Sequence, residues 1–367
     1  MSRARTFADL ATASEGDSLA SPNMITNGDM SIAQRGTSST GQSSSGIKCV
    51  DQYHYLHNGG GTADISQSST APNGFKNSLK VECNAADSDL GAGEFSGIRQ
   101  HIEAQHCQKL LFGTSDAKAI TISFHVRSKQ TGTYALNLFL DDDTIQFTKT
   151  YTISSADTWE KKTITFPANT SAVIEDDTGK GIEFTWWLRA GSTYTGGSAM
   201  SGYEAYSNGD AAVGHAVDFL DDAANEFYLT GVQLEIGEVA TPYKYETFAE
   251  NLARCQRYFY LFGRFQMSGY QSGTTSAIGT IYTPVRMRAD PSVSFSVHSG
   301  YSDNTTSIST QGEAHTNRTM TGQTAERKPG TAIEFTIQCS GGFGGSDNRP
   351  LNLFNFFGDF LFDVEYT

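Results

Sequence analysis

Histidine, cysteine and carboxylate side chains gather at a few places in the chain, and metal binding is the first chemistry to consider there. His101, His106 and Cys107 lie close together. The five-residue step between the two histidines would set them about 140° apart on a helix, which is a poor geometry for chelation. Polar surface histidines are the simpler interpretation, and we expect no transition-metal site.

Acidic runs offer a second possibility. Asp141–Asp143 follows an apolar segment, and Asp176-Asp177 and Asp221-Asp222 are similar pairs. Adjacent carboxylates at a strand end can hold calcium, but such runs also form ordinary solvated turns. We expect no cofactor, with calcium as the one ion that these carboxylates leave open.

Catalytic signatures are missing from the sequence. GxSxG, HExxH and Walker A patterns do not occur. A glycosidase needs two carboxylates across a sugar cleft, and 40 acidic residues supply many pairs without singling one out. We therefore expect no catalytic residues and a protein that is not an enzyme.

Aromatic residues suggest binding rather than catalysis. Trp186 and Trp187 are adjacent in a predicted strand, so one should face the core and the other could be exposed. Tyr194, Tyr203 and Tyr206 follow in a Gly/Ser-rich segment. Exposed rings beside polar groups suit sugar binding, because ring faces stack on the apolar faces of sugars. The alternative is that these tyrosines fill a loop core or a subunit interface.

The elements that carry these residues are predicted to be strands. Ile120–Val126 alternates strictly between apolar and polar residues, and Gly, Asn and Asp separate similar runs. The fold class is therefore all-β, with two antiparallel β-sandwich or jelly-roll domains in tandem after a short N-terminal peptide. The boundaries are 1–22, 23–247 and 248–367. Further strands are predicted at Met24–Ile32 (broken by a turn at Asn27–Asp29), Tyr134–Leu140, Trp159–Phe166, Ile182–Leu188, Glu226–Leu234, Tyr258–Phe262, Ser276–Tyr282, Ser292–Val297, Ala332–Gln338 and Phe360–Tyr366. Helices are predicted at Glu103–Leu111 and Phe248–Tyr258. Long surface loops are predicted over Ser299–Gly330.

Charge and cysteine content exclude several classes of protein. The net charge is −14 and no Lys/Arg cluster occurs, so we expect no nucleic-acid partner. No apolar stretch is long enough to predict membrane insertion. Five cysteines without a CxxC spacing indicate free, mostly buried thiols, as expected for assembly in a bacterial cytoplasm.

Both chain ends suggest assembly. Leu351–Phe362 is too apolar for an exposed monomer edge, which predicts an oligomer contact at Phe354, Phe356 and Phe357 together with Tyr258 and Phe259. At the other end, Thr6–Ala13 could form two helical turns. Either this end is frayed or it is an adaptor peptide that attaches to a partner, with contacts from these residues: Arg3, Arg5, Phe7 and Leu10.

Five motifs in order resemble those of bacteriophage tail-fibre and related virion proteins. The opening motif is Asn27–Met30 followed by Ile32–Arg35, and Gly231–Gly237 with Ala240–Tyr243 resembles the closing strand and exit of the same module. The other three are the joining segment Glu250–Phe259, the strand-turn Pro284–Pro291, and the start Ser2–Arg5 with Ala8–Leu10.

This resemblance implies a jelly-roll module similar to carbohydrate-binding modules, a second β-domain, and a homo-oligomeric virion component, often a trimer. A tail fibre or fibre-like appendage, with possible binding of host-surface polysaccharide, is the first expectation. The alternatives are a capsid fibre or decoration protein without a receptor role, and a polysaccharide depolymerase. Calcium-binding members carry Tyr-x-Asp-Asp-Val in the last strand, whereas this chain reads Tyr228–Val232 without the Asp pair.

Overall fold

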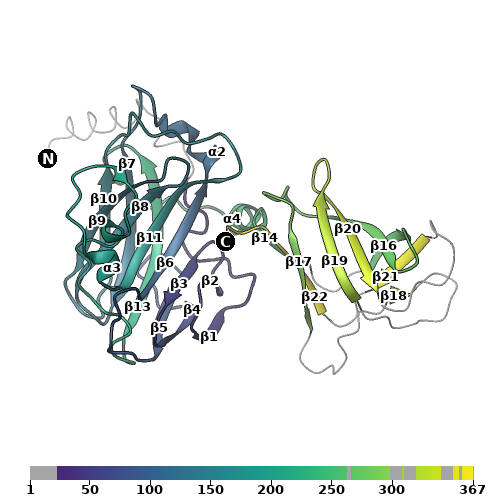
Figure 1. Ribbon diagram of the computed structural model, residues 1–367, viewed down its shortest axis with the longest axis horizontal. Coiled ribbons are helices and arrows are strands. Elements are labelled where there is room, and N and C mark those ends of the chain that lie inside the picture. The colour runs from purple at the N-terminus through teal and green to yellow at the C-terminus, as the bar shows by residue number, and fades with distance from the viewer. Residues whose placement is uncertain are drawn as a thin grey trace. The chain divides into compact units, whose positions relative to one another are not determined.

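The computed structural model describes residues 23–262, 266–297, 308–309, 320–339, 350–354 and 358–366. The chain divides between Asn251 and Leu252 into two compact units, here called unit 1 and unit 2 (Figure 1). Helix α4, Phe248–Gln256, spans this division. In the described ranges, no helix is long and apolar enough to cross a membrane.

Unit 1 is a sandwich of two antiparallel sheets. The six-stranded sheet has the order β1 (Ser38–Gln42), β4 (Thr62–Ser68), β5 (Ser78–Ala85), β13 (Glu226–Ile236), β7 (Ile120–Ser128), β10 (Glu160–Phe166). The seven-stranded sheet has the order β12 (Glu204–Ala205), β9 (Ile145–Ile153), β8 (Gly132–Leu140), β11 (Lys180–Ala190), β6 (Phe95–Glu103), β3 (His54–Asn58), β2 (Gly46–Ile47). The all-β prediction is confirmed.

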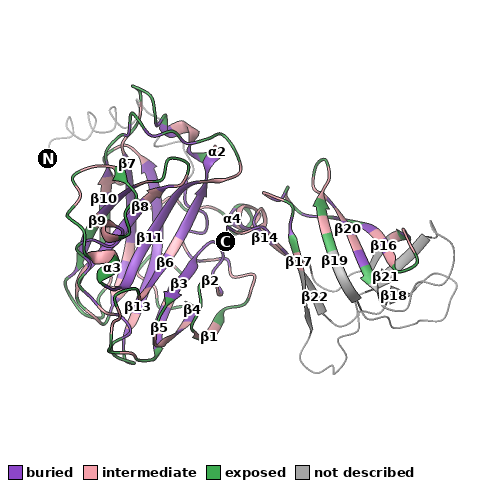
Figure 2. Ribbon diagram, in the orientation of Figure 1, coloured by how far each residue is buried: buried purple, intermediate pink, exposed green. Residues whose placement is uncertain are grey.

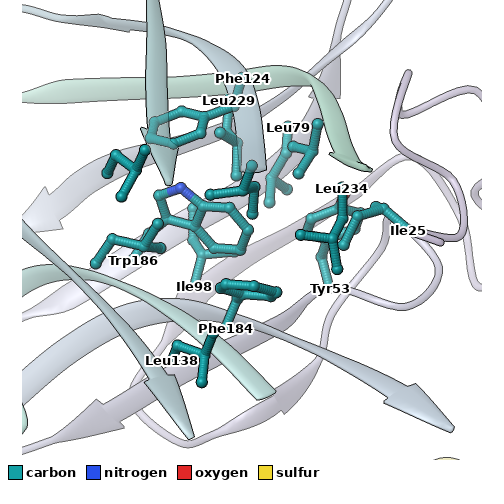
Figure 3. Packing of buried hydrophobic residues seen from close by; sticks show 14 of the residues in the cluster. Ile25, Tyr53, Leu79, Ile98, Phe124, Leu138, Phe184, Trp186, Leu229 and Leu234 are labelled. Carbon is teal, nitrogen blue, oxygen red and sulfur yellow. The ribbon is translucent and has the colours of Figure 1, made fainter. Parts of the chain in front are cut away.

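The core of unit 1 lies between these sheets, where alternate residues of each strand point inward. Trp186 of β11 is fully buried, and its ring meets Phe124 of β7 edge to face at a centroid distance of 5.7 Å. Figure 3 shows Phe184, Ile98 and Leu229 around the same indole. Figure 2 shows how continuously the central strands are buried. These contacts fix which face of each strand points outward.

Several predicted elements change on folding. Met24–Ile32 is a run of turns rather than a strand, because Asn27 and Met30 adopt the left-handed conformation, with φ of 57° and 58°. The predicted helix at Glu103–Leu111 is reduced to α2 (Ala104–Cys107) and a 3₁₀ turn (Gln108–Leu110). The segment after β11 holds α3 (Ser192–Thr195) and a second 3₁₀ turn (Asn208–Asp210).

Unit 2 also consists of antiparallel strands. One sheet has the order β14 (Phe259–Phe262), β22 (Gly358–Asp363), β17 (Ser292–Val297). The other has the order β18 (Ile308–Ser309), β21 (Pro350–Phe354), β15 (Gln266–Gln271), β16 (Ser276–Tyr282), β20 (Ala332–Cys339), β19 (Met320–Arg327). Phe335 and Phe362 are fully buried in its core. Strand β19 corrects the prediction that 299–330 is loop throughout, because its mixed polar sequence is held by pairing with β20.

Candidate functional site

The outer face of the seven-stranded sheet carries polar side chains on its central strands. In β11, Ile182, Phe184 and Trp186 belong to the core. Glu183 and Thr185 lie between them in the strand and therefore point to the opposite face. Strands β6 and β8 flank β11 on either side (Figure 1). On this outer face, charged, polar and aromatic side chains from several strands lie side by side.

Five side chains from three strands form what we call the Arg99 cluster: His54, Arg99, His101, Glu183 and Thr185. The strand register pairs Glu183 with His101 and Thr185 with Arg99, and β3 places His54 opposite Arg99. One oxygen of Glu183, Oε1, lies 2.7 Å from Arg99 Nε, and the other, Oε2, lies 2.9 Å from His101 Nε2. The rings of His54 and His101 meet edge to face at 4.9 Å.

The charge states of this cluster follow from its burial. Burial alone would raise the pKa of Glu183, but the His101 hydrogen bond and the Arg99 charge hold it below its usual value. Burial lowers the pKa of His101 in spite of Glu183. Burial, then His101 and Arg99, also lower the pKa of His54 well below its usual value. At neutral pH the cluster therefore contains one ion pair, Arg99–Glu183, and two neutral imidazoles, His54 and His101. The neutral His101 donates a hydrogen bond from Nε2 to Glu183.

The guanidinium of Arg99 is held along one edge. Its Nε donates to Thr185 Oγ1 at 3.1 Å and pairs with Glu183. Within the described residues, its Nη1 and Nη2 make no hydrogen bond. The Arg99 side chain is 31% exposed, whereas that of Glu183 is 7% exposed. The cluster therefore offers solvent an oriented pair of N–H donors.

Aromatic rings border the cluster on the β8 side. Phe139 is the register partner of Glu183. Its ring meets that of Tyr206 at 5.3 Å, and Tyr206 is 43% exposed. Burial raises the pKa of Tyr206, while the Arg99 and Glu183 charges act on that pKa in opposite directions. Aromatic surface and hydrogen-bond donors thus lie together.

The other predicted aromatic residues have different surroundings. Trp186 is in the core, and Trp187 is 5% exposed. The expectation that one indole is exposed is corrected, because the segment after β11 packs Ala211, Ala212 and Tyr194 over Trp187. Tyr194 is half-buried there. Tyr203 packs edge to face on Phe147 at 5.4 Å, and its hydroxyl donates to the Pro167 carbonyl.

A second buried charge lies at the end of β11. Arg189 has a side chain only 1% exposed, and its Nη2 lies 2.9 Å from both Asp87 Oδ2 and Glu94 Oε2. Its Nη1 donates to the Asp87 carbonyl at 2.9 Å, and its Nε lies 3.3 Å from Asp218 Oδ1. The two Nη groups are hydrogen-bonded and Nε faces Asp218 as an ion pair, so this guanidinium joins the 86–94 loop to the segment around Asp218 rather than facing a ligand.

Three of the motifs that resemble those of virion proteins contribute to one hydrogen-bonded network. We call this network the clasp, and its members are Asn23, Asn27, Gly28, Val232 and Asn251. Asn23 Nδ2 donates to the Val232 carbonyl at 2.9 Å, and Val232 N donates to the Gly28 carbonyl at 2.9 Å. Asn27 N donates to Asn251 Oδ1 at 3.0 Å, across 224 positions of sequence. A Cβ on Gly28 would lie 2.1 Å from the Val232 oxygen, so only glycine fits. These motifs close unit 1 and fix the first turn of α4 to it.

Two of the acidic runs that could hold calcium accept hydrogen bonds from the chain itself. Asp142 Oδ2 accepts from Glu175 N, and Asp143 Oδ2 accepts from Val173 N. Asp221 accepts from the Asn225 amide, and Asp222 accepts from Ala224 N. Across the described ranges, no group of three or more His, Cys, Asp or Glu side chains is placed to hold a metal ion.

The predicted assembly residues are only partly described. Arg3, Arg5, Phe7 and Leu10 lie outside the described residues, as do Phe356 and Phe357, and of Phe354 only its place in β21 is known. Tyr258 and Phe259 are 4% and 1% exposed. The expectation that these two line an oligomer contact is corrected, because they are buried within the chain.

Comparisons with known proteins give structural likenesses only. No family model matches the chain, and no curated protein matches its sequence. Among solved structures, the enzymatically active domain of tailspike protein 4 from bacteriophage CBA120 is similar over 58% of this chain, at 11% identity and a TM-score of 0.33. That match spans only 21% of the tailspike chain.

Two carbohydrate-binding modules are similar over a comparable stretch. The family 11 module of a Clostridium thermocellum cellulosomal cellulase matches 55% of this chain and 98% of its own, at 10% identity and a TM-score of 0.28. A family 61 module, solved with β-1,4-galactotriose, matches 59% of this chain and 99% of its own, at 11% identity and a TM-score of 0.29. At these values the likenesses assign no ligand to this chain, and the argument below rests on its own residues.

Sequence reasoning found one edge of the site and missed its centre. Tyr206 was predicted, whereas the interpretation of His101 as a polar surface histidine is wrong, because His101 is buried against Glu183. Arg99 and Glu183 carried a signal, since each is a charged residue at an alternate position of an otherwise apolar strand. Reading it required the register between β6 and β11, which no local pattern supplies.

Proposed function

We propose that the protein is a non-enzymatic structural component of a bacteriophage particle that binds a surface polysaccharide of the host through the Arg99 cluster and Tyr206. The observation that carries the sugar-binding part is the partly exposed Arg99 side chain, whose guanidinium is held on its Nε edge, together with the Phe139 and Tyr206 rings. Ring faces and fixed polar groups are what sugar recognition requires.

The cluster favours binding over hydrolysis. Both oxygens of Glu183 are engaged, one by Arg99 and one by His101. A general acid needs a raised pKa, whereas the pKa of Glu183 is lowered. The carboxylate is therefore suited to orienting Arg99, and side chains that hold one another lose little conformational entropy on binding a ligand.

A panel of immobilised bacterial surface polysaccharides tests this function. The full chain should bind at least one of them, and Arg99→Lys and Tyr206→Ala should each weaken that binding by roughly tenfold or more. The matched controls are Arg127→Lys on the outer face of the six-stranded sheet and Tyr282→Ala in unit 2, which should bind like the parent protein. Absence of binding across the panel, or equal loss in the controls, would contradict the proposal. New reducing ends during incubation would contradict its non-enzymatic part.

The particle role is supported by the resemblance of the ordered motifs to virion proteins. This role is tested by incorporation into particles, independently of sugar binding. Deleting residues 2–22 should leave a folded protein that no longer enters particles. Normal incorporation of the deleted form would contradict attachment by this peptide.

A further inference from the structure

The direction of the Arg99 guanidinium suggests which sugars the outer face takes. Glu183 and Thr185 occupy its Nε edge, and the two Nη groups have no hydrogen-bond partner within the described residues. Two parallel N–H donors at the spacing of a guanidinium match the two oxygens of a carboxylate. A lone sugar hydroxyl would satisfy only one of them.

The charges around the cluster point the same way. The chain carries a net charge of −14, yet Arg99, Arg35 and Lys180 all act as positive charges on His54. Lys180 faces Asp141 at 3.4 Å, which is longer than the 2.7 Å between Arg99 and Glu183. An anionic group can therefore approach this patch although the protein as a whole is acidic.

We propose that Arg99 reads the carboxylate of an acidic sugar, so that the polysaccharide bound by this outer face contains uronic acid residues. This inference rests on the proposed sugar-binding function. Glu183 keeps the guanidinium compensated in the free protein and fixes its orientation, so the ligand carboxylate meets a prepared donor pair. The adjoining Phe139 and Tyr206 rings supply contact for the body of the sugar.

The test compares acidic polysaccharides with uncharged versions of themselves. The full chain is measured by biolayer interferometry against polygalacturonate, alginate and hyaluronan, each also in a carboxyl-reduced form, and against a set of neutral bacterial glycans. We expect at least one acidic form to bind roughly tenfold or more tightly than its reduced form, and increased salt to weaken that binding.

Arg99→Lys separates the donor pair from charge alone. It keeps a cation beside Glu183, which favours folding, but it presents no parallel donor pair. We expect this variant to lose most of the preference for the acidic form, while Arg127→Lys keeps it. If Arg99→Lys keeps the preference for the acidic form unchanged, the proposal that Arg99 binds the sugar carboxylate would be overturned.

The outcomes distinguish this inference from the function on which it rests. Equal binding of acidic and reduced forms, or binding of neutral glycans only, would overturn the acidic class and leave sugar binding standing. Absence of binding to every polysaccharide would overturn both.

Discussion

Replacing Arg189 by methionine should destabilise unit 1 strongly, and more at neutral than at acidic pH. The substitution keeps an unbranched side chain of similar length and removes the guanidinium that joins Asp87, Glu94 and Asp218. Arg189 is 1% exposed, whereas its partner side chains are 18–24% exposed. Breaking a buried ion pair from one side costs about 3–5 kcal/mol, and the partial hydration of the three carboxylates places this case near 3 kcal/mol. For a unit of this size that corresponds to a drop of roughly 6–12 °C in Tm.

The pH dependence has a definite sign. Burial already raises the pKa of Asp218, and Arg189 lowers it. Without Arg189, burial and the nearby Asp221 and Asp87 charges raise the pKa of Asp218 further, so Asp218 binds its proton more tightly in the folded than in the unfolded chain. The variant therefore gains stability, relative to the parent protein, as the pH falls from 7 towards the unfolded-state values near 4.

Urea unfolding followed by tryptophan fluorescence measures this difference. All three tryptophans, at positions 159, 186 and 187, lie in unit 1, so the signal reports that unit alone. The control Arg127→Met removes a partly exposed pair with Asp157 and the contact of the guanidinium with the Tyr228 ring, and should cost about 1–2 kcal/mol. A loss below about 1 kcal/mol for Arg189→Met, or a loss that grows on acidification, would refute the reasoning.

Three further outcomes are expected. Asn251→Ala removes hydrogen bonds of the clasp, so trypsin should cut after Lys244 roughly tenfold faster than in the parent protein. An unchanged rate of cleavage would show that the clasp does not hold this segment. Cys49 and Cys83 should not react with a thiol reagent until the protein unfolds, because burial raises their pKa to about 12 and about 11; rapid native labelling would contradict this. Burial lowers the pKa of His54 well below its unfolded value of 6.5, so on acidification His54 takes up a proton in the unfolded chain before it does in the folded chain. Thermal stability should therefore fall as the pH drops below about 6.5. A Tm that rises in this range would contradict the prediction.

The strands that could be predicted from sequence are those with a clear apolar face. Ile120–Ser128 alternates between core and outer side chains, and Ser276–Tyr282 was predicted with the bounds that the structure shows. Thr62–Ser68 and Met320–Arg327 were missed because their sequences are largely polar and the strands exist through pairing with β5 and β20.

The turn at the start of unit 1 shows the opposite error. Met24–Ile32 has the apolar spacing of a strand, but Asn27 binds back to the chain through its side chain, donating to the carbonyls of Ile32 and Asp51. Such side-chain bonds offer the backbone an alternative to sheet pairing. They depend on Asp51 and Asn251, which are distant in sequence, so local pattern could not reveal them.

The same limit applies to the Arg99 cluster. Its members come from β3, β6 and β11, and a shift of one residue in any of these strands would turn its side chain into the core. The sequence supplied the residue types and one aromatic neighbour, Tyr206. The fold supplied the neighbours that orient Arg99.

The most direct test of sugar binding by the outer face is an experimental structure of the full chain with an oligosaccharide taken from the polysaccharide it binds most tightly. We predict sugar density against the Nη groups of Arg99 and the ring of Tyr206, with a sugar carboxylate facing the guanidinium. Sugar density on another surface, with the Arg99 cluster occupied only by water at saturating ligand, would contradict the proposal.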